Sequence, residues 1–119
     1  MAIINKQENG GTVVFTLEGN KVDAAKEQVN QIFENSGYKL IKEQGSTYVY
    51  EKGSRIMRLL FGAFVTYHKQ SVTIENQGDV TKVMLNKSSS GFSGGLIGVA
   101  AVKKEFNRLK QEIENDLSL

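Results

Sequence analysis

Side chains that commonly carry chemistry are sparse in this sequence. Cysteine is absent, which excludes thiolate catalysis, disulfides and cysteine-ligated zinc. The single histidine, His68, stands between Tyr67 and Lys69 in a predicted strand, with no second histidine to share a metal ion. A general base needs a nucleophile within hydrogen-bond reach, and the sequence identifies none. We therefore interpret His68 as an ordinary strand histidine and expect no catalytic residue, cofactor or metal site.

The carboxylates stand mostly alone or on the surface of a predicted helix. Glu112, Glu114 and Asp116 lie near the end of the last helix, where Arg108 and Lys110 can pair with them. A catalytic pair of carboxylates, brought together only by the fold as in glycosidases, is an alternative that the sequence leaves open. We favour the simpler interpretation that these acids keep the surface of the helix solvated.

A glycine-rich stretch precedes the last helix and can be tested as a phosphate-binding loop. Backbone amides of such a turn at a helix N-terminus bind anions, and Lys103 and Lys104 follow it. The glycines match neither G-x-x-x-x-G-K-S/T nor G-x-G-x-x-G; they are Gly91, Gly94, Gly95 and Gly98. The stretch is also apolar. We favour a structural crossover that brings the backbone close to the sheet, with anion binding as the alternative.

Two connections, residues 55–65 and 91–101, are apolar and interrupted by glycine, whereas loops are normally polar. They could cover each other within one chain, or form an exposed patch for a second copy, another protein or a lipid. They could also close over an apolar small molecule. The residues of the interaction-patch hypothesis are Arg55, Arg58, Leu60, Phe61, Phe64, Phe92, Leu96 and Ile97.

These alternatives define two functions from different classes. The first is a non-catalytic binding or protein-interaction domain, with a homodimer as one form of it. The second is a carrier or enzyme for an apolar small molecule bound between the sheet and the C-terminal helix. The polar contacts of that ligand would be Tyr48, Tyr50, Tyr67 and His68.

The charge balance and the hydropathy pattern limit which classes of partner and which cellular compartment are expected for this chain. The 15 basic residues nearly balance the 13 acidic ones, which argues against nucleic-acid binding. The N-terminus lacks the pattern of a signal peptide, and no apolar run approaches the roughly 20 residues of a transmembrane helix. We expect a cytoplasmic protein.

Strands and helices must position these residues, and their periodicities are clear. Alternation predicts strands over residues 11–18, 38–43, 47–51, 66–76 and 80–86. A helix over residues 21–35, with Asn20 as its N-cap, is predicted from spacings of three and four residues. The apolar stripe of this helix is Val22, Ala25, Val29, Ile32 and Phe33. Residues 55–61 are interpreted as a short helix or ordered flap, and residues 1–10 as a loosely ordered start.

The last helix carries the apolar seam around which the chain is organised. That seam consists of Val99, Val102, Phe106, Leu109 and Ile113. The element order β-α-β-β-β-β-α predicts a single α+β domain over residues 1–119. It has two layers, with both helices on one face of an antiparallel sheet of about five strands. A sheet with a long C-terminal helix on it resembles helix-grip folds, several of which enclose apolar ligands; a likeness of fold carries no function.

Overall fold

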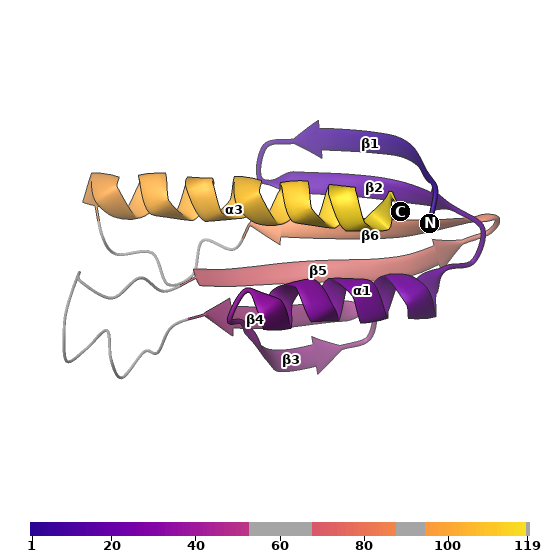
Figure 1. Ribbon diagram of the computed structural model, residues 1–119, viewed down its shortest axis with the longest axis horizontal. Helices are drawn as coiled ribbons and strands as arrows, with labels where there is room; N and C mark the ends of the chain where they lie inside the picture. Colours follow the sequence, from indigo (N-terminus) through magenta and orange to yellow (C-terminus); the bar gives the residue numbers. More distant parts are fainter. Residues whose placement is uncertain (53–67, 88–94, 119) are drawn as a thin grey trace.

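A computed structural model describes residues 1–52, 68–87 and 95–118 (Figure 1). Its elements are β1 (Ile3–Asn9), β2 (Thr12–Glu18), α1 (Val22–Asn35), β3 (Lys39–Gln44), β4 (Thr47–Lys52), β5 (His68–Gln77), β6 (Val80–Lys87) and α3 (Gly95–Leu117). The strands form one antiparallel sheet in the order β1-β2-β6-β5-β4-β3. The sheet is open and does not close on itself. One antiparallel sheet together with the two helices confirms the predicted α+β class.

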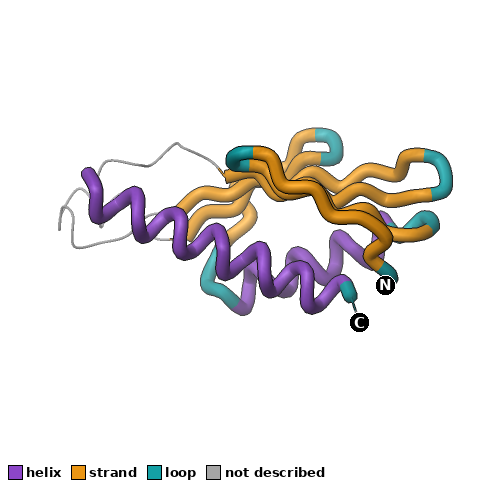
Figure 2. The backbone as a smooth tube through the Cα atoms, turned by 90° about the horizontal axis from the view of Figure 1, so that it is seen from above, coloured by secondary structure: helices purple, strands orange, loops and turns teal. Residues whose placement is uncertain are grey.

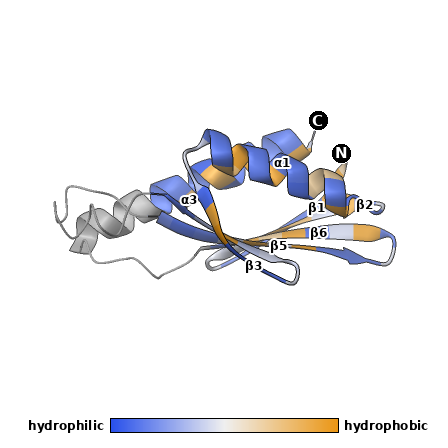
Figure 3. Cartoon of the chain, turned by 90° about the horizontal axis from the view of Figure 1, so that it is seen from below, coloured by the Kyte–Doolittle hydropathy of each residue, from blue (hydrophilic) through white to orange (hydrophobic). Residues whose placement is uncertain are grey.

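Both helices lie on the same face of the sheet (Figure 2), which confirms the predicted two layers. Hydrophobic residues occur in the strands and on the helices that cover them (Figure 3). The core between the layers is a continuous cluster that includes Phe15 and Leu17 of β2, Val29 and Phe33 of α1, and Leu109 of α3. These five residues are at most 1% exposed, so the interface is filled by side chains of the chain itself.

The apolar seam of α3 is confirmed where the structure describes it. Phe106, Leu109 and Ile113 are buried, and Leu117 extends the seam by one more turn. The side chains of Val99 and Val102 lie outside the described residues, as does the flap predicted at 55–61.

The strand count was one too low, because residues 1–10 were expected to be loosely ordered. They contain β1, which pairs antiparallel with β2 through a turn at Gly10, where φ is +62°. The element order is therefore β-β-α-β-β-β-β-α. Six of the seven β1 side chains are exposed. An edge strand of this kind has no alternation of apolar residues to announce it.

The start of α1 also differs from the expectation. Asn20 is not the N-cap; Lys21 occupies that position and makes no side-chain capping bond. The buried Thr81 of β6 instead holds the backbone that leads into α1. Its hydroxyl accepts a hydrogen bond from the Lys21 backbone N–H at 2.7 Å and donates one to the Gly19 carbonyl at 2.8 Å. A tertiary contact therefore fixes the start of α1, although it binds the N-cap residue itself and not the N–H groups of the first turn that a capping side chain binds.

Candidate functional site

Polar side chains gather at one end of the sheet–helix interface. The antiparallel register places Lys52, the last residue of β4, opposite His68, the first residue of β5. It also places Gln70 opposite Lys87 at the end of β6. His68 and Gln70 are 8% and 1% exposed, on the strand positions that further along β5 carry core residues. The interface is therefore apolar along most of its length and polar where these strands end.

Glu105 of α3 is the centre of this polar region. Its carboxylate accepts a hydrogen bond from the Tyr38 hydroxyl at 2.7 Å. It also accepts two from Arg108, from Nε at 2.8 Å and from Nη2 at 3.1 Å. The Lys52 ammonium lies 3.8 Å away. We call Tyr38, Lys52, His68, Gln70, Glu105 and Arg108 the Glu105 cluster; it joins α3 to both β4 and the residue that precedes β3.

The electrostatics of the cluster keep Glu105 ionised and Tyr38 protonated. Burial alone would raise the pKa of Glu105, but hydrogen bonds from Arg108 and Tyr38, with the charges of Arg108 and Lys52, outweigh burial and lower the pKa. Burial and the bond to Glu105 raise the pKa of Tyr38 well above its ordinary range. A carboxylate with a low pKa and four neighbouring donors is a poor general base. The arrangement is suited to holding α3 against the sheet rather than to proton transfer.

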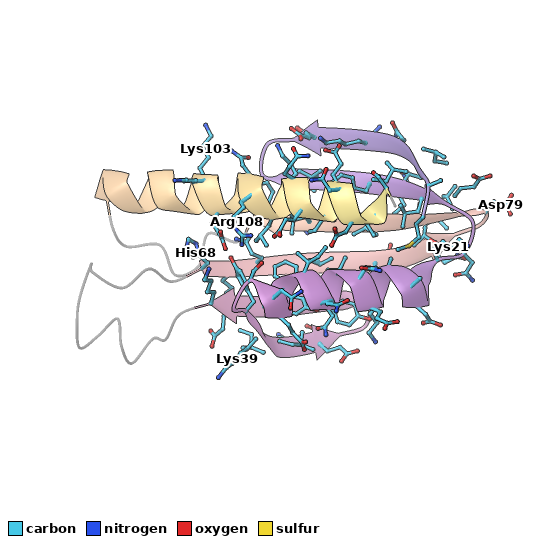
Figure 4. The ribbon with its side chains drawn as sticks, in the orientation of Figure 1. Lys21, Lys39, His68, Asp79, Lys103 and Arg108 are labelled. Atoms are coloured by element: carbon cyan, nitrogen blue, oxygen red, sulfur yellow. The ribbon has the colours of Figure 1, made fainter. Side chains whose placement is uncertain are left out.

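Two buried polar atoms of the cluster have no hydrogen-bond partner among the described residues: Nδ1 of His68 and Oε1 of Gln70. Burial lowers the pKa of His68; Glu105 opposes this effect, and the charges of Lys52 and Arg108 add to it. The imidazole is therefore neutral near pH 7. Figure 4 shows His68 beside Arg108, between β5 and α3.

These pKa shifts predict that acid destabilises the fold in two steps. A group whose pKa is lower in the folded protein binds fewer protons there than in the unfolded chain, so the free energy of unfolding falls as the pH drops. For His68 the fall begins near its ordinary value of 6.5, and for Glu105 near its ordinary value of 4.5. The thermal midpoint, measured from about pH 8 to about pH 3, should therefore decline in both ranges. His68→Phe should flatten the upper range and Glu105→Gln the lower one; unchanged profiles in both variants would contradict the assignment.

The tyrosines predicted as polar contacts of a ligand have packing roles. Tyr50 stacks on Phe33 with ring centroids 4.2 Å apart, and its hydroxyl donates a hydrogen bond to Asn30 at 2.9 Å. Burial raises the pKa of Tyr50 to about 12. Tyr48 is 7% exposed, with the Lys26 ammonium 5.0 Å from its ring centroid. Both rings belong to the core, and Tyr50 lies directly opposite Gln70 of the Glu105 cluster in the sheet register.

Other predicted site residues fall outside what the structure describes. Tyr67 is one of them. The interaction-patch residues that also lie outside the described ranges are Arg55, Arg58, Leu60, Phe61, Phe64 and Phe92. Leu96 and Ile97 belong to the first turn of α3, but their side chains are not described. The patch hypothesis and the anion-binding alternative for residues 91–98 therefore stay predictions.

The acids at the end of α3 are partly paired on the surface, in line with solvation. Arg108 donates to Glu112 at 2.7 Å, and Lys6 of β1 lies 2.9 Å from Glu114. Lys110 lies 3.0 Å from Glu8. The two bridges made with Lys6 and Glu8 connect α3 with β1, but exposed pairs each contribute little to stability.

Sequence reasoning identified His68 but missed Lys52, Gln70 and Glu105 as its neighbours. Within residues 1–52, 68–87 and 95–118, no three His, Cys, Asp or Glu side chains converge to hold a metal ion. In the same ranges, no helix is both long and apolar enough to cross a membrane. The fold and the site define a small α+β domain with an open antiparallel sheet. No protein-family model matches the chain, and no curated protein matches it.

Proposed function

We propose that the chain is a non-catalytic interaction domain of the cytoplasm that pairs with a second copy of itself through its two apolar connections. One observation carries the proposal. The elements that flank both connections end together: β4, β5, β6 and α3 all have a terminus at the same end of the molecule (Figure 1). Segments far apart in sequence are thus anchored side by side.

The strand register makes this anchoring specific. Lys52 and His68 flank residues 53–67 and are direct cross-strand neighbours. Lys87 starts the connection to α3 and lies opposite Gln70, two residues into β5. Both connections are rich in large apolar side chains by sequence, and the described residues that flank them lie at one end of the molecule. We propose that the connections offer these apolar side chains to the second copy.

The Glu105 cluster supports a non-catalytic role beside these connections. Its carboxylate is engaged by Tyr38, Arg108 and Lys52, so it holds α3 against the sheet at the end where the connections are anchored. A rigid base reduces the entropy lost when a binding surface is formed. The alternative, an apolar ligand between sheet and α3, has less support, because side chains of the chain fill the described part of that interface.

Sedimentation velocity of the full chain over a range of concentrations tests the proposal. We expect concentration-dependent dimerisation, and we expect the double variant Leu60→Gln, Phe61→Gln to stay monomeric. The matched control is Ile4→Gln, Leu40→Gln, which removes apolar side chains that are 55% and 44% exposed on the two edge strands. A wild-type chain that stays monomeric at every concentration would overturn the proposal. Equal loss of dimer in both variants would also overturn it, because general surface hydrophobicity would then be the cause.

A further inference from the structure

We infer that the end of the molecule at which β4, β5, β6 and α3 have a terminus docks on an anionic lipid bilayer. The charges of the chain are unevenly distributed, although their total is nearly balanced. Residues 51–69 and 87–105 hold seven basic and two acidic residues, out of 15 and 13 in the chain. The rest of the chain has eight basic and eleven acidic residues. A local excess of positive charge of this kind attracts an anionic partner.

The sheet contributes three lysines to this end. Lys39 lies opposite Glu51, and Glu51 lies opposite Lys69, so the three form one cross-strand row. Lys69 stands between two buried positions of β5, which places the row on the face of the sheet away from the helices (Figure 2). The next residue of β4, Lys52, lies on the helix side, 3.8 Å from Glu105 of α3. Positive side chains therefore lie on both faces of the sheet.

The last helix contributes two more lysines. Lys103 and Lys104 are exposed and come directly before Glu105, so they lie near the level at which β4 ends. In the part of the chain that the structure describes, neither has an ion-pair partner. We call Lys39, Lys52, Lys69, Lys103 and Lys104 the basic collar.

The collar surrounds the end of the molecule and does not follow one face. In Figure 4, Lys103 and Lys39 lie on opposite margins of the molecule, and Asp79 lies at the far end. A flat surface that meets the molecule end-on reaches the whole collar, whereas a polyanion that lies along one face reaches only part of it. A bilayer with anionic head groups is such a surface.

The start of α3 has the composition that the interior of a bilayer requires. Residues 95–102 are all glycine, alanine, valine, leucine or isoleucine, whichever way each side chain points. They precede Glu105, and the helix here continues beyond the ends of the strands (Figures 1 and 2). Eight helical residues measure about 12 Å, less than half of a hydrocarbon core of about 30 Å. Insertion into one leaflet would therefore leave Lys103 and Lys104 at the level of the head groups.

Binding to a bilayer does not depend on the proposed dimer. A second copy and a bilayer would occupy the same end, so vesicles should compete with dimerisation. A chain that is monomeric at every concentration would overturn the dimer and could still bind vesicles. Absence of vesicle binding would leave the dimer untouched.

Flotation of the full chain with vesicles is the test. We expect binding to vesicles of phosphatidylglycerol and phosphatidylcholine in equal amounts, and none to vesicles of phosphatidylcholine alone. Binding should weaken as the ionic strength rises from about 0.01 M to about 1 M, since the Debye length falls from about 30 Å to about 3 Å. The chain has no tryptophan, so Ile97→Trp reports insertion. Its emission should shift to shorter wavelength with the anionic vesicles.

Charge variants locate the contact. The double variants Lys103→Gln, Lys104→Gln and Lys39→Gln, Lys69→Gln should each bind the anionic vesicles roughly thirtyfold more weakly, the loss expected for two lysines near an anionic surface.

The matched control, Lys21→Gln, Lys82→Gln, removes the same charge elsewhere and should bind as the wild type does. Lys21 lies at the end opposite Lys103 (Figure 4), and Lys82 lies opposite Glu75, far along β5 from the collar. Absence of binding to anionic vesicles at low salt would overturn the inference, as would equal binding to the neutral ones. Equal loss in the control would also overturn it. Displacement from vesicles by duplex DNA, with no shift in the Ile97→Trp emission, would show a general polyanion site instead.

Discussion

Replacing Leu109 with alanine is expected to lower the free energy of unfolding by about 3 kcal/mol. Leu109 is 0% exposed and lies in the middle of the α3 seam, between Phe106 and Ile113. Alanine favours a helix at least as well as leucine does, so the loss cannot come from the helix itself. It comes from the apolar area returned to water and from the cavity left between α3 and the sheet. Urea unfolding followed by circular dichroism measures the change.

The control for this prediction is Asn107→Ala, two residues away on the exposed side of the same helix. We expect that variant to change the free energy of unfolding by less than about 0.5 kcal/mol. Equal effects of the two substitutions would mean that α3 does not dock through this seam. Because the seam joins the last element to the sheet, such a result would contradict the architecture as a whole.

Local periodicity was sufficient to predict most of the fold. The stripe of α1 and the alternation in β2, β4 and β5 are each contained within one element, so neighbouring residues reveal which face is buried. The position of β6 was also indicated. Its residues Val80 and Met84 are half-buried on one face while Val83 and Leu85 are buried on the other, as expected for a central strand.

The strand that periodicity could not reveal is β1. Its side chains are mostly exposed, so no apolar face distinguishes it from a loop. The signal lay in the turn instead. The loop between the paired residues Asn9 and Thr12 is Gly10-Gly11, with a positive φ at Gly10, and a Gly-Gly pair at these two positions is a local mark of a hairpin. Turn chemistry, rather than hydropathy, could have predicted the sixth strand.

The Glu105 cluster was predictable only in part, because it depends on the meeting of four elements. Gln70 could have been predicted as part of it. It lies on the same face of β5 as Val72 and Ile74, so the alternation along the strand places a polar side chain on the buried face. The pairing of Glu105 with Tyr38, 67 residues apart, was not readable. It follows from the docking of α3 beside α1, and sequence spacing alone cannot fix that contact.

Replacing Phe33 with alanine is expected to have the largest effect of any change considered, about 4 kcal/mol off the free energy of unfolding. Phe33 is 0% exposed. Its ring stacks on Tyr50 at 4.2 Å, with 4° between the ring planes, and meets Tyr38 edge-on at 5.1 Å. Alanine would lose the buried area, leave a cavity and remove two aromatic contacts, each worth about 1 kcal/mol beyond area. Chemical denaturation measures the total.

A comparison with Tyr50→Phe separates ring packing from hydrogen bonding. That variant keeps the stack on Phe33 and loses only the bond to Asn30, so it should cost about 1 kcal/mol. A larger cost for Tyr50→Phe than for Phe33→Ala would show that the hydrogen bond, not the ring stack, holds α1 on the sheet. Phe33→Ala has a second consequence, because the Phe33 ring supports Tyr38, whose hydroxyl helps to lower the pKa of Glu105. In that variant the acid destabilisation assigned to Glu105 should therefore become shallower, since a looser Tyr38 brings the pKa of Glu105 closer to its ordinary value.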